Sequence, residues 1–143
     1  MNPYVVTSIR ADQIDPAYAL VVHVEPNLSL EEWRDRCLAA IGMDGRDAGS
    51  ENIIVVTNPL GYIQGLCTVA TRQHPTHGRI LDVPLFVVAS VSDEQGVSLS
   101  LVDYVRALSR TQRCSRIRIR AHGNEDLSAA LRADDSITVE QGH

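Results

Sequence analysis

Apolar and polar positions along the chain follow two periods, and together they predict ten elements of secondary structure. Runs rich in β-branched residues and bounded by turn residues indicate strands, whereas apolar residues three or four positions apart indicate helices. Six strands are expected, at residues 4–10, 52–57, 61–71, 79–90, 114–122 and 136–140. Four helices are expected, at residues 15–22, 29–42, 97–110 and 124–135. The order is β, α, α, β, β, β, α, β, α, β without a repeat or a linker, which indicates one domain spanning residues 1–143.

The first two predicted helices have recognisable starting residues. Asp15 is the expected N-cap of the first helix, and Pro16 is its expected first residue because its fixed φ suits a first turn. The second helix begins with a capping box of Ser29 and Glu32 and is expected to end at Gly42. Its apolar stripe consists of Leu30, Trp33, Cys37 and Ile41. This stripe is expected to face a core.

The middle of the chain predicts an antiparallel meander of three strands. The sequence NPLG at residues 58–61 suits a hairpin turn between the first two of them. Gly65 inside the second strand indicates a β-bulge or the close approach of another backbone. Pro84 has no N–H to donate, so it is expected at a bulge or at an unpaired position of the third strand.

Composition excludes several classes of function. A chain of 143 residues with 44% apolar residues can bury one sizeable core. Its formal charge of −5 argues against a nucleic-acid partner, because modules that bind polyanions carry a positive excess. Arginine supplies all thirteen of the Lys and Arg residues, so chemistry based on a lysine Schiff base or a lysine general base is excluded.

The cysteines and the first residues predict the compartment. Cys37, Cys67 and Cys114 are odd in number and far apart, which argues against a disulfide framework or a CxxC metal site. The N-terminal residues do not have the pattern of a signal peptide, and no apolar run approaches about 20 residues. The sequence therefore predicts a soluble cytoplasmic protein with reduced thiols, no bound metal and no membrane partner.

The order of elements and three local stretches resemble the GNAT superfamily of N-acetyltransferases. SIRADQID at residues 8–15 is similar to the opening of that family, and GYIQGLCTV at residues 61–69 is similar to its third strand. Residues 86–119 resemble the stretch that covers the fourth strand, the cofactor loop, the long helix and the fifth strand. The resemblance spans nearly the whole chain. It implies an α/β GNAT-like (acyl-CoA N-acyltransferase) fold, whose mixed and mostly antiparallel central sheet is flanked by helices.

The resemblance also implies a site for acetyl-CoA as co-substrate. In the family, free backbone groups of the fourth strand pair with the pantetheine arm. The loop pattern (Gln or Arg)-x-x-Gly-x-(Gly or Ala) then turns backbone N–H groups toward the pyrophosphate at a helix N-terminus. Here the pattern falls on residues 93–98. The implied cofactor-binding residues are Phe86, Val88, Gln95, Gly96, Val97, Ser98, Leu99 and Asn124.

This loop departs from the family pattern at its first position. Asp93 stands where Arg or Gln is usual, and beside Glu94 it adds negative charge near the expected pyrophosphate. Gly96 is the strict match. Ser98 is small enough to let the backbone approach a phosphate, and it can instead serve as a helix N-cap.

The catalytic groups are less clear in the sequence. The family often uses a Tyr in the last helix as general acid, but this chain has no Tyr at that position, near Leu131. Glu25 and Asp82 are candidates for a general base, and each also fits a solvated carboxylate. The catalytic residues therefore stay unassigned.

Several polar groups fit structural roles better than chemical ones. His74 and His77 have no third Cys or His nearby, which favours a solvated turn over a zinc site. The alternating arginines at residues 116–120 fit a polar strand face better than a ligand site.

Two functions remain open at the level of the sequence. The first is an N-acyltransferase that carries an acetyl group from acetyl-CoA to a small-molecule or peptide amine, which would enter over residues 16–41. The second is a GNAT-like binding or regulatory module without catalysis, favoured by Asp93, the missing acid and the short C-terminus. One final strand, where the family usually has two, would leave a sheet edge open and so suggests a homodimer.

Overall fold

The computed structural model describes residues 3–43, 51–90, 92–121, 131 and 135–141. These residues form a continuous sheet of six strands with the spatial order β1-β2-β3-β4-β5-β6. Pairing is antiparallel from β1 to β4 and parallel from β4 to β6, so the sheet is mixed and mostly antiparallel as predicted. The strands are β1 (Val5–Ser8), β2 (Asn52–Thr57), β3 (Ile63–His74), β4 (Gly78–Val88), β5 (Arg116–Ala121) and β6 (Ile137–Gln141).

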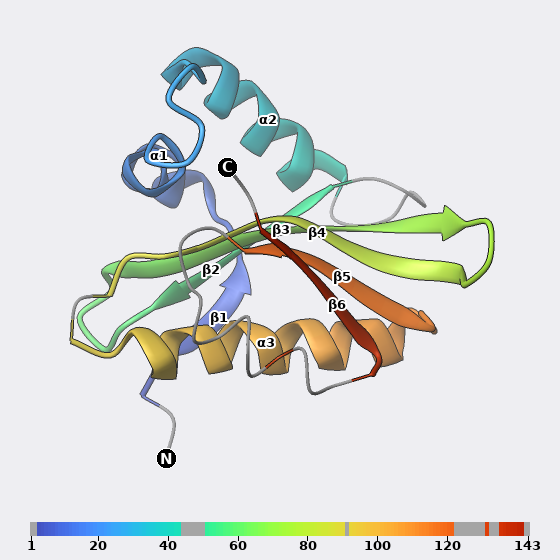
Figure 1. Cartoon of the computed structure of the whole chain (residues 1–143). Helices are drawn as coiled ribbons and strands as arrows, with labels where there is room; N and C mark the ends of the chain where they lie inside the picture. Colours follow the sequence, from blue (N-terminus) through green and yellow to red (C-terminus); the bar gives the residue numbers. More distant parts are fainter. Residues whose placement is uncertain (1–2, 44–50, 91, 122–130, 132–134, 142–143) are drawn as a thin grey trace.

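Helices cover both faces of this sheet (Figure 1). One face carries the 3₁₀ turn η1 (Ala11–Gln13), α1 (Ile14–Val21) and α2 (Leu30–Met43), and the other carries α3 (Glu94–Thr111). Each face has its own apolar cluster between helix and sheet. Trp33 of α2 is buried in the cluster on the α1–α2 side, and Leu101 of α3 is buried in the cluster on the other side, which is called the cluster under α3. In the described part of the chain, no helix has the length and apolar character needed to cross a membrane.

Helix α1 begins two residues earlier than the sequence predicts. Its N-cap is Gln13, not Asp15, and Ile14 is its first residue. The Gln13 side chain accepts a 2.9 Å hydrogen bond from the N–H of Arg10 and so closes the preceding 3₁₀ turn. Asp15 instead binds Arg34 of α2 through two hydrogen bonds of 2.9 and 2.7 Å. A side-chain partner on another helix therefore outweighs the local capping preference of Asp15.

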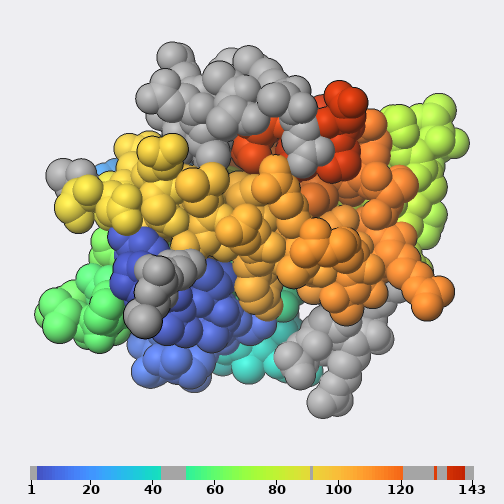
Figure 2. All heavy atoms as spheres, turned by 90° about the horizontal axis from the view of Figure 1, so that it is seen from below, coloured from blue at the N-terminus to red at the C-terminus, as the bar shows by residue number. Residues whose placement is uncertain are grey.

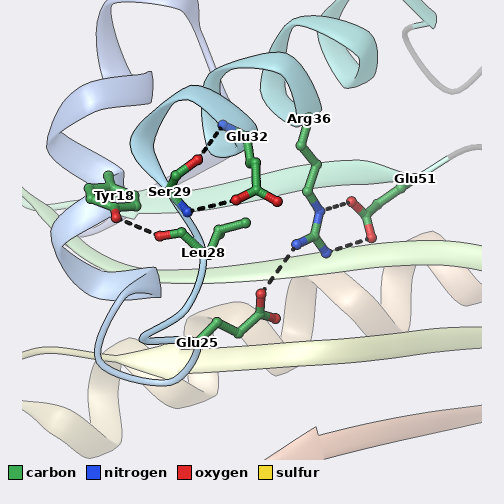
Figure 3. Close-up of polar contacts among 7 residues, drawn as sticks. All are labelled: Tyr18, Glu25, Leu28, Ser29, Glu32, Arg36 and Glu51. Carbon is green, nitrogen blue, oxygen red and sulfur yellow. Dashed lines mark hydrogen bonds and ion pairs between the residues drawn. The ribbon is translucent and has the colours of Figure 1, made fainter.

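The predicted capping box of α2 is confirmed. Ser29 Oγ accepts from the N–H of Glu32 at 3.0 Å, and the Glu32 carboxylate accepts from the N–H of Ser29 at 3.1 Å (Figure 3). Trp33 and Cys37 are fully buried as expected, but Ile41 is exposed and Ala40 is buried instead. Near the end of α2, the buried position is therefore one residue earlier than the sequence predicts.

Gly65 and Pro84 also behave as predicted. A Cβ on Gly65 would lie 2.9 Å from Val97 Cγ1, so α3 packs directly on the backbone of β3 at this glycine. The pairing of β2 with β3 is also irregular next to Gly65. Between Val83 and Leu85, β4 has one residue more than β3 and β5, and that extra residue is Pro84 at the bulge.

The expected helix at residues 124–135 lies outside the described residues except for Leu131 and the exposed Asp135 at its end. Leu131 is helical and buried in the cluster under α3. The expected final strand is present as β6, which runs parallel to β5.

Candidate functional site

Strand β4 extends beyond its neighbour β5. The last pair between them joins Phe86 to Ala121, whereas β4 continues to pair with β3 through Val87 and Val88. Among the described residues, no strand pairs with the β5-facing edge of β4 beyond Phe86. The side chains of Phe86 and Val88 pack in the cluster under α3. These two residues therefore offer backbone groups at this edge rather than side chains.

A short turn leads from this edge into α3. The N–H of Asp93 donates to Ser90 Oγ at 3.2 Å, and the helix begins with Glu94. The predicted start at Val97 is therefore wrong by three residues, and Ser98 is not the N-cap. The N-cap is Asp93, whose carboxylate accepts from the N–H of Gly96 at 3.1 Å. This hydrogen bond lets the helix begin before the apolar repeat that marks it in the sequence.

Tyr4, near the N-terminus, forms a hydrogen bond with the same carboxylate. Its hydroxyl donates to Asp93 Oδ2 at 2.6 Å, and this bond is the largest cause of a raised pKa for Tyr4. The ring of Tyr4 also packs against the cluster under α3. Figure 2 shows this face, where α3, in yellow to orange, crosses the molecule beside the blue N-terminal segment. Asp93 thus joins the residue just before β1 to the start of α3.

The residues expected to form the pyrophosphate loop lie inside the first turns of α3. Gln95 is exposed, and Gly96 is the third residue of the helix. Val97 and Ser98 are fully buried, so their side chains belong to the core. Leu99 is partly exposed. Asn124, the last of the expected cofactor-binding residues, lies outside the described residues, and the assignment of this group to a cofactor stays a prediction.

The charge at the start of α3 is negative. Asp93 and Glu94 precede or open the helix, and the sequence has no basic residue between Arg79 and Arg106. The positive end of the helix dipole and the Gly96 N–H already interact with the Asp93 carboxylate. A pyrophosphate placed here would meet a carboxylate where the family resemblance implies a donor. The helix terminus therefore does not fit that group as it stands. The β5-facing edge of β4 beyond Phe86, which pairs with no strand in the described part of the chain, fits a pantetheine arm.

The two candidate bases are both held by arginines. A carboxylate oxygen of Glu25 lies 3.7 Å from Arg36, which also forms two hydrogen bonds of 2.6 and 3.0 Å with Glu51 (Figure 3). Asp82 accepts a 3.0 Å hydrogen bond from Arg118. Neither carboxylate is therefore assigned as a general base.

The other predicted polar groups have structural roles. His74 Nδ1 lies within hydrogen-bond distance of the N–H groups of Thr76, at 3.1 Å, and His77, at 3.2 Å, and so shapes the β3–β4 hairpin. Within the described ranges, no group of three or more His, Cys, Asp or Glu side chains is arranged to hold a metal ion. The β5 arginines bind neighbouring strands, as Arg116 does with Thr138 and Arg120 does with Glu140.

Sequence reasoning missed Tyr4 and the Arg36–Glu51 pair. Tyr4 stands 89 residues from Asp93, so no local pattern connects them. Arg36 is a half-buried residue beside the buried Cys37 of α2, and Glu51 precedes a strand by one residue. In the sequence both look like ordinary solvated residues.

Comparison with solved structures identifies the fold. No protein-family model and no curated protein sequence matches the chain. An acetyltransferase from Trypanosoma brucei is 18% identical with a TM-score of 0.66, over 91% of this chain and 89% of that one. The aminoglycoside N-acetyltransferase AAC(6')-Iy in complex with CoA is 10% identical with a TM-score of 0.72, over 98% and 90% of the two chains. Glucosamine-6-phosphate N-acetyltransferase from Arabidopsis thaliana is 12% identical with a TM-score of 0.68, over 91% and 88%.

These similarities define the class of fold. The chain has the α/β fold of the GNAT acetyltransferases, as the sequence resemblance predicts. AAC(6')-Iy has been solved both with CoA and with a bisubstrate analogue that joins CoA to an acetylated neamine. At identities of 10–18%, the comparison establishes the architecture, and the activity of this chain is a separate question.

Proposed function

We propose that the protein is an acyl-CoA-dependent N-acyltransferase that transfers an acetyl group from acetyl-CoA to an amine. The observation that carries this proposal is the β5-facing edge of β4 beyond Phe86, next to a bulge at Pro84 and within a GNAT fold. An extended thioester arm can pair with this backbone in the manner of an added strand. The two structural neighbours named for an amine-bearing substrate, an aminoglycoside and glucosamine-6-phosphate, support an amine as acceptor.

In this proposal, the chain positions the two reactants and supplies backbone hydrogen-bond donors. The amine nitrogen attacks the thioester carbonyl and forms the amide bond, the carbon–sulfur bond breaks, and the sulfur leaves as a thiolate. A backbone N–H of β4 beyond Pro84 donates to the carbonyl oxygen as negative charge develops there. The amine loses one proton, and the thiolate takes up one proton. Holding the two reactants together accounts for part of the rate enhancement.

A groove beside η1, α1 and α2 supports binding of a small amine. Its volume is about 370 Å³, and its lining residues are Ala11, Asp12, Ile14, Asp15, Arg34 and Leu38. Asp12 and Asp15 are paired with Arg10 and Arg34, so they give the groove polar groups, and Ile14 and Leu38 offer apolar contact. Ile14 also belongs to the apolar cluster that contains Leu85 and Val87 of β4. We therefore place the acceptor on the α1–α2 side of the sheet.

A second function is favoured by one specific observation. Because the Asp93 carboxylate already caps α3, the helix terminus lacks the open anion site that the family resemblance implies. A GNAT-like module that binds or regulates a partner without catalysis would need no such site.

A binding measurement distinguishes the two functions. Acetyl-CoA at about 100 times its dissociation constant should stabilise the protein by about 2.7 kcal/mol and raise Tm by several degrees. Calorimetry then gives the affinity, and release of free thiol in the presence of a panel of amines tests transfer. Binding together with amine-dependent thiol release supports the enzyme. Failure to bind at millimolar acetyl-CoA would remove the basis of the enzyme proposal and favour the regulatory module.

A further inference from the structure

We propose that Asp93 sets the class of acyl donor, so that the site recognises the pantetheine thioester arm and gains no affinity from the pyrophosphate. This inference rests on the proposed acyl transfer and specifies its donor. A donor that lacks the ADP portion of CoA should therefore bind about as well as acetyl-CoA itself. Asp93 acts here as a specificity-determining residue.

The Asp93 carboxylate lies against the backbone at the start of α3. Asp93 Oδ1 accepts from the N–H of Gly96, the third residue of α3. A Cβ built on Gly96 would come within 2.2 Å of Asp93 Oδ2, so the carboxylate lies directly against this glycine. A glycine at this position lets an anion approach the backbone closely. In this chain the anion is the protein's own side chain.

Hydrogen bonds to both the side chain and the main chain hold Asp93 in this position. The Tyr4 hydroxyl donates to Oδ2 at 2.6 Å. The main chain of Asp93 is fixed as well, through its N–H to Ser90 Oγ at 3.2 Å and its carbonyl oxygen to the N–H of Val97 at 3.2 Å. A phosphate bound in this place would break the hydrogen bonds that the Asp93 carboxylate accepts from Tyr4 and from Gly96. The displaced carboxylate would still lie beside the phosphate.

The residues at the start of α3 carry negative charge. Glu94 adds a second carboxylate in the first turn of α3, and the sequence has no basic residue between Arg79 and Arg106. A pyrophosphate at this terminus would therefore be repelled rather than attracted. The pantetheine arm is uncharged along its amides, and it would pair with the β4 edge beyond Phe86. Recognition of the arm is therefore separable from recognition of the pyrophosphate.

The test compares two donors on four proteins by calorimetry. The donors are acetyl-pantetheine and acetyl-CoA, and the proteins are the wild type, Asp93→Asn, Glu94→Gln and Tyr4→Phe. Asparagine is a good N-cap, so Asp93→Asn keeps the cap while removing the charge. Glu94→Gln changes the net charge equally from an exposed position and is the matched control. Circular dichroism and unfolding curves confirm that each variant folds.

The expected result is a change in selectivity. The wild type should bind the two donors with affinities within about threefold of each other. Asp93→Asn should bind acetyl-CoA about tenfold more tightly while its affinity for acetyl-pantetheine stays the same. Tyr4→Phe should change the selectivity in the same direction by a smaller factor, since it releases one of the two side-chain bonds, and Glu94→Gln should have less effect than Asp93→Asn.

Other outcomes overturn the inference and separate it from the proposed function. If the wild type binds acetyl-CoA more than about tenfold more tightly than acetyl-pantetheine, the inference is wrong while acyl transfer stands. The same holds if Asp93→Asn leaves the affinity for acetyl-CoA unchanged. If neither donor binds the wild type or Asp93→Asn at millimolar concentration, the proposed function and the inference both fail.

Discussion

Val97 of α3 lies directly over Gly65 of β3, so closely that a Cβ on the glycine would come within 2.9 Å of Val97 Cγ1. The same Cβ would lie 3.3 Å from Leu101 Cδ1 and 3.3 Å from the carbonyl oxygen of Val87. Val97 and Leu101 are fully buried among other side chains and are not exposed to solvent. The start of α3 is therefore positioned against the end of β4 through the bare backbone of Gly65.

Replacing Gly65 by alanine should destabilise the protein by about 1–3 kcal/mol, the usual cost of overpacking a core. Urea unfolding monitored by circular dichroism measures this loss. Gly42→Ala is the matched control, because nothing lies within 4 Å of a Cβ at Gly42 and this residue is in helix α2. The control should be neutral or stabilising. Equal stability of Gly65→Ala and the wild type would contradict the packing described.

The three cysteines should differ in reactivity. Burial raises the pKa of Cys37 and of Cys67 to about 12, and it also raises the pKa of the half-buried Cys114. Because the thiolate is the reactive form, Cys37 and Cys67 should be protected at pH 8 in the folded protein. A colorimetric thiol reagent should titrate Cys114 slowly in the native state and all three thiols after addition of denaturant. Rapid native titration of more than one thiol would show this prediction to be wrong.

The capping box of α2 should make stability depend on pH. Hydrogen bonds from the N–H and hydroxyl of Ser29 hold the pKa of Glu32 below its ordinary value of 4.5. A carboxyl whose pKa is lowered by folding stabilises the protein above its unfolded pKa, and this stabilisation is lost as the pH falls through the folded value. The wild type should therefore be more stable than Glu32→Gln at pH 7, and the difference should shrink below about pH 4.5.

Urea midpoints measured from pH 7 to pH 3 give this comparison. Glu31→Gln is the control, because Glu31 lies in the same first turn but does not face Ser29. A difference between Glu32→Gln and the wild type that stays constant down to pH 3 would argue against a capping role.

The ion pair between Arg36 and Glu51 should contribute more to stability than the one between Arg36 and Glu25. Glu51 receives two hydrogen bonds from Arg36 and is half-buried, whereas Glu25 lies 3.7 Å away and is more exposed. Glu51→Gln should cost about 1 kcal/mol and Glu25→Gln at most about 0.5 kcal/mol. Chemical unfolding of both variants compares the two losses of stability. A larger loss for Glu25→Gln than for Glu51→Gln would contradict the prediction.

A homodimer remains a proposal that solution mass can test. Strand β6 forms one edge of the described sheet, and its outer backbone groups could pair with a second copy of the chain. Light scattering at tens of micromolar protein should then give twice the mass of the chain. A monomer at that concentration would exclude a stable dimer.

The features that the sequence predicts well depend on residues that act locally. Ser29 and Glu32 stand three positions apart and satisfy each other's backbone groups, so the pattern alone locates the start of α2. Gly65 and Pro84 impose backbone constraints that hold in any strand. The sequence does not predict the cap of α3 in the same way, because the apolar repeat begins after the helix does.

The contacts that the sequence does not predict join distant parts of the chain. Tyr4 meets Asp93 only because β1 and the start of α3 come together in the folded protein. Asp15 has the local pattern of an N-cap, but Arg34 on the next helix binds it. In both cases a tertiary partner decides the role of a carboxylate, and one sequence alone does not reveal that partner.

The extra residue in β4 also limits how the length of this chain can vary. Before Pro84, Leu81 and Val83 point toward α3, whereas after it Leu85 and Val87 point toward α1 and α2. The alternation of β4 side chains between the two faces of the sheet is therefore reversed at Pro84. Deleting Pro84 would restore a regular ladder and leave Leu85 and Val87 on their present face of the sheet. A deletion elsewhere in β4 would instead turn the side chains on one side of it to the opposite face, so the bulge is the point of this strand at which its length can change.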